Sequence, residues 1–68
     1  MDTQTLPKPG QRIECVYMGG DPNPIPVGSR GTVLKVQEIV PGDHHIDVAW
    51  DSGRTLGLLS LIDRYRIL

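Results

Sequence analysis

Residues 48–56 read VAWDSGRTL, and this stretch predicts a β-hairpin. Val48 and Trp50 recur at the two-residue period that is typical of one face of a half-buried strand. Asp-Ser-Gly then supplies a tight turn, because Gly53 can adopt the positive φ that a short hairpin loop requires. A strand returning at Thr55 completes the hairpin, so we expect antiparallel β-structure.

Further runs of β-branched and aromatic residues lie on both sides of this hairpin. In the first run, Val16 and Met18 interrupt the alternation near its end, which predicts a bend or bulge. Residues 60–63, before the last run, are too few for an α-helix and fit a single 3₁₀ turn. The expected strands are residues 12–18, 32–40, 44–50, 55–59 and 65–68.

A long loop is expected after the first strand, because residues 19–28 read GGDPNPIPVG. Prolines at a spacing of two forbid a helix and remove hydrogen-bond donors from a β-ladder. Five short strands, a Pro-rich loop after the first and a 3₁₀ turn before the last are the element order of an SH3-like barrel. Closing the sheet would also remove edges that promote aggregation. We therefore expect an all-β fold, a small five-stranded SH3-like barrel.

The chain of 68 residues has the length of one small domain with a modest core. Residues 1–9 are polar and end in two closely spaced prolines, so a flexible N-terminal arm is expected there. Residues 10–68 are expected to form a single domain. Nothing at the start resembles a signal peptide, and no stretch approaches the roughly 20 apolar residues of a membrane span. A cytoplasmic protein without membrane contact is expected.

The charge balance disfavours a polyanionic partner, because seven Lys and Arg stand against eight Asp and Glu and the net charge is −1. The last third of the chain is nevertheless richer in arginine, and Asp63 is the only acidic residue after Asp51. A local cationic face therefore remains an alternative.

Several motifs recur in an order that points to a known family: Met18, Asp21-Pro22, Pro26-x-Gly28-x-x-Gly31-Thr32-Val33 and Ile46-x-Val48-x-Trp50-Asp51-x-Gly53-x-x-Leu56. Over residues 10–67 this pattern resembles the small bacterial and phage family filed as domain of unknown function 4314. The resemblance implies an SH3-like barrel, often encoded by phages and mobile elements, with no assigned activity. The residues of the N-terminal arm lie outside the pattern that carries it.

No catalytic or metal-binding arrangement is evident in the sequence. Cys15 is the only cysteine, which excludes a disulfide within the chain, and it lies in the middle of an expected strand without an activating neighbour. His44 and His45 are adjacent, so in a strand they point to opposite faces and cannot hold one ion together. We expect no enzyme, no metal and no cofactor.

Several conspicuous residues have a structural and a functional interpretation. Trp50 either fills the core of a chain that has no phenylalanine or is partly exposed as a recognition residue. Asp51 either stabilises its turn or binds a cationic partner. Three glycines are assigned to turns: Gly28, Gly31 and Gly53. They do not form a phosphate-binding loop, because no helix is expected after any of them.

The leading hypothesis is a small interaction module that binds another protein or peptide. A groove between the loop of residues 21–26 and the hairpin turn of residues 50–54 would receive an extended segment, since restricted loops on rigid scaffolds often carry binding residues. The phage context implied by the resemblance fits an accessory protein that acts on a host protein. The expected contact residues are Asp21, Pro22, Pro24, Trp50, Asp51 and Arg54.

Two alternatives remain open. One is RNA or DNA binding, against which the acidic net charge and the few aromatic residues count. The other is a homo-oligomeric structural or ligand-sequestering protein, since a small domain gains stability and a pocket by pairing with copies of itself. The candidate nucleic-acid face consists of Arg12, Arg30, Arg54, Arg64 and Arg66.

Overall fold

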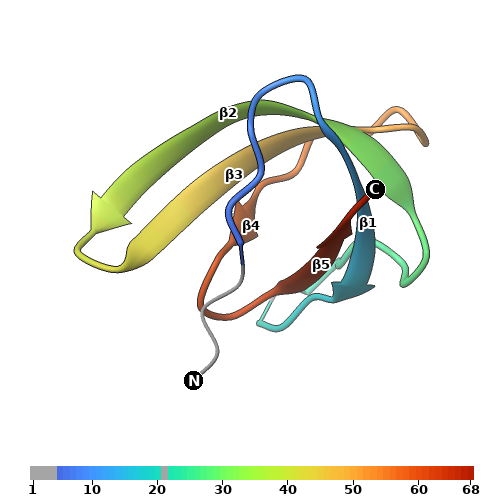
Figure 1. Cartoon of the computed structure of the whole chain (residues 1–68). Coiled ribbons are helices and arrows are strands. Elements are labelled where there is room, and N and C mark those ends of the chain that lie inside the picture. Colours follow the sequence, from blue (N-terminus) through green and yellow to red (C-terminus); the bar gives the residue numbers. More distant parts are fainter. Residues whose placement is uncertain (1–4, 21) are drawn as a thin grey trace.

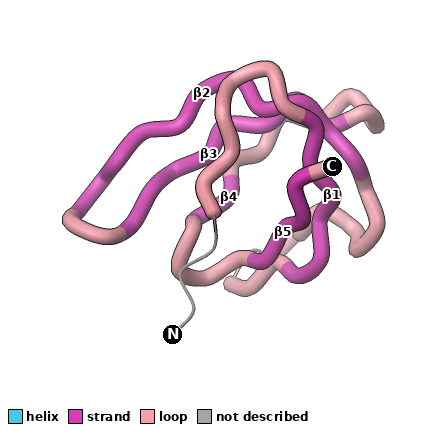
Figure 2. Tube along the Cα trace, viewed as in Figure 1, coloured by secondary structure: helices cyan, strands magenta, loops and turns pink. Residues whose placement is uncertain are grey.

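The computed structural model describes residues 5–20 and 22–68, and within them the chain forms β-strands joined by turns and loops (Figure 1). Figure 2 shows no helix in this part of the chain. The expectation of an all-β fold is therefore confirmed. The strands are β1 (Arg12–Tyr17), β2 (Arg30–Val40), β3 (Asp43–Trp50), β4 (Leu58–Leu59) and β5 (Arg64–Ile67).

The five strands form one antiparallel sheet in the order β4-β3-β2-β1-β5. The sheet is not closed into a barrel, because the described residues contain no pairing between its two end strands, β4 and β5. The expected closure is wrong for a physical reason. With only two residues, β4 offers an edge too short for another strand, and the chain turns immediately afterwards.

The hairpin predicted from residues 48–56 forms at its turn but not along its full second strand. Gly53 has a φ of 98°, and the Trp50 N–H donates to the Arg54 carbonyl at 2.8 Å. Thr55 forms an isolated bridge with Ala49, and regular pairing resumes only at β4. The indole N–H of Trp50 donates to the carbonyl of Leu56 at 2.9 Å, so this carbonyl accepts a side-chain hydrogen bond in place of a backbone bond between strands.

The bulge predicted at the end of the first strand is confirmed. The register between β1 and β5 shifts between Cys15 and Tyr17. Ile13 and Cys15 therefore point into the core, whereas the side chain of Tyr17 is 56% exposed. The expected 3₁₀ turn is instead a hydrogen-bonded turn without helical residues, in which the N–H groups of residues 62 and 63 donate to the Leu59 carbonyl.

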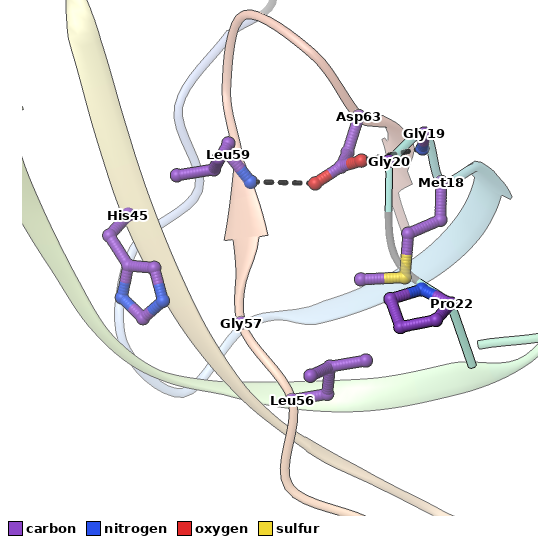
Figure 3. Close-up of a pocket in the computed structure, with 9 residues that line it drawn as sticks. All are labelled: Met18, Gly19, Gly20, Pro22, His45, Leu56, Gly57, Leu59 and Asp63. Carbon is purple, nitrogen blue, oxygen red and sulfur yellow. Dashed lines mark hydrogen bonds between the residues drawn. The ribbon is translucent and has the colours of Figure 1, made fainter. Parts of the chain in front are cut away.

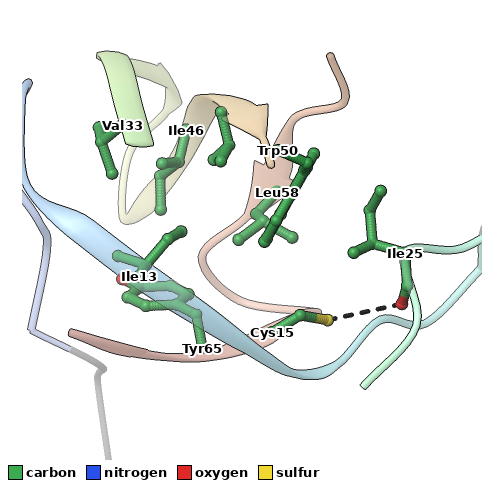
Figure 4. Close-up of a cluster of buried hydrophobic side chains, with 9 residues drawn as sticks. Ile13, Cys15, Ile25, Val33, Ile46, Trp50, Leu58 and Tyr65 are labelled. Atoms are coloured by element: carbon green, nitrogen blue, oxygen red, sulfur yellow. Dashed lines mark hydrogen bonds between the residues drawn. The ribbon is translucent and has the colours of Figure 1, made fainter. Parts of the chain in front are cut away.

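The core lies inside the curve of the sheet, where side chains from β1 and β5 face those from β3 and β4 (Figure 4). Trp50 is 3% exposed, which confirms that it fills the core. The Pro-rich loop contributes Ile25, and the Cys15 thiol lies 3.6 Å from the Ile25 carbonyl. The buried core residues are Ile13, Cys15, Ile25, Val33, Ile46, Val48, Trp50, Leu58 and Tyr65.

The described part of the N-terminal segment, residues 5–9, contacts the sheet. Leu6 packs against the core and Pro7 is buried. The phenolic O–H of Tyr65 donates to the Thr5 carbonyl at 2.9 Å, which ties the segment to β5. This packing removes apolar surface of Leu6 and Pro7 from water. Residues 1–4 of the expected arm lie outside the described residues.

Candidate functional site

A pocket of about 310 Å³ opens where the loop after β1 meets β3, β4 and the residue before β5 (Figure 3). Four of its side chains are apolar and provide most of its walls. Figure 3 shows His45 on one side of Gly57 and Met18 and Pro22 on the other. The lining residues are Met18, Gly19, Gly20, Pro22, His45, Leu56, Gly57, Leu59 and Asp63.

The loop wall of the pocket is held in place by Met18. Its thioether sulfur accepts a hydrogen bond from the N–H of Ile25 at 3.3 Å, and Ile25 is itself part of the core. Met18 also packs against the core cluster. One end of the Pro-rich loop is thus attached to the rigid sheet, so the pocket wall does not need to be ordered when a ligand binds.

The carboxylate of Asp63 joins two walls of the pocket. One oxygen accepts the N–H of Gly19 at 2.9 Å, and the other accepts the N–H of Leu59 at 2.8 Å. The residue is only 3% exposed, so its charge is stabilised by these backbone donors and not by bulk water. Asp63 therefore fixes the loop after β1 against β4.

The imidazole of His45 forms a third wall and lies directly over Gly57. A Cβ atom at residue 57 would clash with Nε2 of His45, so the ring occupies the space that a side chain at this residue would fill. On the other side of the ring, Nδ1 lies 3.0 Å from a carboxylate oxygen of Asp47. The Asp47 carboxylate thus holds one edge of the ring, and the opposite edge lies over Gly57.

The pocket has the chemistry of a binding site for an apolar group. Its described lining contains no hydroxyl, thiol or lysine that could act as a nucleophile. The thiol of Cys15 is fully buried, and its pKa is raised by burial and, to a smaller extent, by the charge of Asp63. Among the described residues, no group of three or more His, Cys, Asp or Glu side chains could hold a metal ion.

The chain matches the family model described as domain of unknown function (DUF4314) over residues 4–68. The chain belongs to the DUF4314 family. A search of curated proteins and a search of solved structures found no match. The match includes part of the N-terminal segment, in line with the packing of Leu6 against the core of this DUF4314 domain.

The structure distributes the expected contact residues of the DUF4314 domain over different environments. Pro22 lines the pocket, Pro24 is exposed outside it, and Asp21 lies outside the described residues. Trp50 lies in the core and offers no exposed ring to a partner. The guanidinium of Arg54 donates to the carbonyls of residues 23 and 24, at 2.7 Å and 3.4 Å. Arg54 thus spans the space between the loop and the hairpin turn where a groove was expected.

Asp51 pairs with an arginine from another strand of the DUF4314 domain. Its two carboxylate oxygens accept hydrogen bonds from the guanidinium of Arg12, at 2.7 Å and 2.5 Å. This hydrogen bonding lowers the pKa of Asp51 below its ordinary value, with a smaller contribution from the charges of Arg12 and Arg30. Both side chains remain solvated. The pair connects the hairpin turn with β1.

The arginines of the alternative nucleic-acid face are mostly engaged within the domain. Arg12 pairs with Asp51, Arg30 lies 3.4 Å from a carboxylate oxygen of Glu14, and Arg54 binds loop carbonyls. Arg64 and Arg66 are exposed on β5. The described residues place no carboxylate in an ion pair with either of these two.

Two of the three glycines assigned to turns have a positive φ, 91° at Gly28 and 98° at Gly53. The assignment of Gly31 to a turn is wrong, because this residue lies inside β2 opposite Trp50. A Cβ atom there would be 2.7 Å from a methyl group of Val48 and 2.8 Å from the Ala49 carbonyl. Gly31 is thus required for the close approach of β2 and β3.

Sequence reasoning missed most of the pocket. The sequence pattern presents His45 only as a candidate metal ligand, and Asp63 only as a turn residue and as the single acidic residue after Asp51. One signal was present in the sequence: Gly57 interrupts an expected strand, and a glycine at such a position often marks a close approach of another group.

In the part of the chain that the structure describes, no helix is long and apolar enough to cross a membrane.

Proposed function

We propose that this DUF4314 domain is a non-enzymatic interaction module that binds an extended segment of another protein. A large apolar side chain of that segment enters the pocket formed by Met18, Pro22, Leu56 and Leu59. The observation that carries the proposal is this set of apolar walls around an open volume of about 310 Å³. Apolar surface that remains accessible in a concave site gains free energy when a ligand covers it.

The size of the pocket favours a side chain over a whole small molecule. Ligand pockets commonly measure about 300–1,000 Å³, and 310 Å³ is at the lower end of that range. Such a volume accommodates one large apolar side chain together with some adjacent backbone. The rest of the partner segment would then lie on the surface around the opening.

The walls of the pocket are held in place before any partner arrives. Asp63 joins Gly19 to Leu59, and Arg54 holds the carbonyls of the Pro-rich loop. A preorganised site pays less conformational entropy on binding. The proposed surface thus keeps the Pro22 end of the loop but replaces the hairpin turn of residues 50–54 with the segment of residues 56–59.

The test is a selection of displayed random peptides against the immobilised domain, followed by affinity measurements on the enriched peptides. Leu59→Glu places a charge in the apolar wall without removing a core residue, since Leu59 is only partly buried. Leu34→Glu is the matched control, because Leu34 is exposed on β2 and does not line the pocket. We expect Leu59→Glu to weaken binding at least about tenfold and Leu34→Glu to leave it within about twofold.

Both variants are first compared with the wild type by thermal melting, so that a loss of binding is not a loss of fold. Enriched peptides should share a large apolar residue. The proposal is overturned when no peptide is enriched, or when the enriched peptides bind folded Leu59→Glu as tightly as the wild type.

A further inference from the structure

An exposed surface continues from the pocket on the far side of Gly19. Tyr17 is 56% exposed and Ile62 is 50% exposed, although both have large apolar side chains. A Cβ atom at Gly19 would be 3.1 Å from the Tyr17 ring and 3.4 Å from a methyl group of Ile62. Because Gly19 also lines the pocket, these two side chains border the site already described.

Arg64 lies beside this apolar surface. It pairs with Tyr17 in the register between β1 and β5, so the two residues are direct neighbours across the strands. Arg64 is exposed, and the described residues place no carboxylate in an ion pair with it. Arg12 and Arg30, in contrast, each have an acidic partner. We call Tyr17, Ile62 and Arg64 the shelf.

We propose that the shelf binds an acidic side chain of the same partner segment, next to the apolar residue that enters the pocket. This inference rests on the proposed function. The guanidinium of Arg64 offers a pair of donors that matches a carboxylate, and the Tyr17 ring and Ile62 supply apolar contact beside it. Exposed tyrosine and arginine together are typical of the residues that dominate protein interfaces.

The charges of the pocket and of the shelf favour the shelf as the place for the acidic group. The carboxylate of Asp63 lines the pocket and would repel a second carboxylate there. On the shelf, the same acidic group meets the positive charge of Arg64. The partner is therefore an extended peptide in which a large apolar residue is followed or preceded closely by Asp or Glu.

The experiment uses the peptides enriched on the wild-type domain and two charge reversals on β5. Arg64→Glu changes the shelf. Arg66→Glu is the control, because Arg66 is exposed on the same strand but lies opposite Glu14, and not Tyr17, in the strand register. Thermal melting first establishes that both variants are folded, since a glutamate opposite Glu14 costs stability. We expect an acidic residue within about three positions of the apolar one. Arg64→Glu should weaken binding at least about tenfold, whereas Arg66→Glu should change it less than about threefold.

A charge exchange sharpens the test. Peptides in which the acidic residue is replaced by lysine should bind the wild type poorly and regain affinity for Arg64→Glu, which isolates the pairwise interaction. The shelf proposal is overturned when the peptides show no acidic preference, when Arg64→Glu binds them like the wild type, or when both reversals weaken binding equally. In each of these cases, a continued loss of binding in Leu59→Glu leaves the pocket proposal standing.

Discussion

The end of the domain that carries the pocket differs in what holds it together from residues 37–42, the end of β2 and the turn to β3, which we call the outer hairpin. At the pocket end, Asp63, Arg54 and Trp50 bind the backbone of other segments through their side chains. In the outer hairpin, the strand register shifts between Glu38 and Val40, and the apolar side chains of Ile39 and Val40 are exposed. Figure 1 shows the turn of this hairpin extending away from the other strands.

This difference shows that a segment can be held either by regular strand pairing or by side-chain hydrogen bonds to other segments. β2 and β3 are the longest strands of the domain, yet the outer hairpin contributes no residue to the core cluster. The pocket end has the shortest strand, β4, and yet its loops are tied by partly buried hydrogen bonds. Substitutions at the pocket end should therefore cost much more stability than equivalent substitutions in the outer hairpin.

The largest expected effect is that of Trp50→Ala. This change removes a large buried ring and also leaves the Leu56 carbonyl without its indole donor. We expect a loss of about 3–5 kcal/mol in the free energy of unfolding, enough to unfold a domain of this size. Denaturant unfolding followed by circular dichroism measures it.

Ile39→Ala is the comparison for that variant in the outer hairpin. Ile39 is exposed, so its truncation should change the free energy of unfolding by no more than about 0.5 kcal/mol. Equal losses in the two variants would contradict the distinction between the two regions.

An intermediate effect is expected for Asp63→Ala. The change leaves the N–H groups of Gly19 and Leu59 without their acceptor, which should cost about 1–3 kcal/mol. It should also release the loop after β1, so peptides selected on the wild type should bind more weakly even where the domain remains folded. Amide hydrogen exchange at Gly19 and Leu59 measures the local effect directly.

Asp43→Ala serves as the control for Asp63→Ala, since Asp43 accepts hydrogen bonds from the Ser60 hydroxyl and the Leu61 N–H but does not line the pocket. Peptide binding that falls equally in both variants would show that general loosening, and not the position of the loop, weakens the site.

The smallest effect is expected for the exposed pair of Arg12 and Asp51, and it should be visible as a dependence on pH. Because the pKa of Asp51 is lowered in the folded state, its contribution to stability is present above the ordinary aspartate pKa and is lost as pH falls through the lowered value. Asp51→Asn should therefore show a weaker loss of stability on acidification than the wild type. Thermal melting between neutral and acidic pH, at low and high salt, measures the difference.

Added salt should reduce that difference, since both side chains are solvated. Parallel pH profiles for the wild type and Asp51→Asn would show that the ion pair does not contribute to the stability of the hairpin turn.

Much of the local structure could be predicted because it depends on residues close in sequence. The alternation in residues 44–50, the turn glycine Gly53 and the bulge after Cys15 were visible in the residue pattern itself. Closure of the barrel could not be predicted reliably from the sequence, because it depends on pairing between β4 and β5, and no local sequence pattern specifies that pairing. The length of β4 was also overestimated, since the Leu56 carbonyl is taken by the indole of Trp50.

Among the described residues, Pro22 is the one expected contact residue that lines the candidate site. In the sequence, nothing distinguishes Asp63 from the other aspartates, such as Asp51. The two residues have different roles because they differ in burial: Asp51 remains in solvent with Arg12, while Asp63 is enclosed and binds two backbone N–H groups. Burial is set by how distant segments pack, so the sequence pattern around each aspartate could not separate them.

The sequence by itself determined an all-β chain with its strands, its hairpin turn and a Pro-rich loop, because backbone preferences and side-chain alternation act over a few residues. Only the tertiary structure decided that the sheet stays open and that Met18, His45 and Asp63 meet around one pocket. These residues come from three separate segments. Their meeting depends on two contacts: the Asp63 carboxylate binds the N–H groups of Gly19 and Leu59, and the His45 ring lies over Gly57. Both contacts form only once the chain has folded.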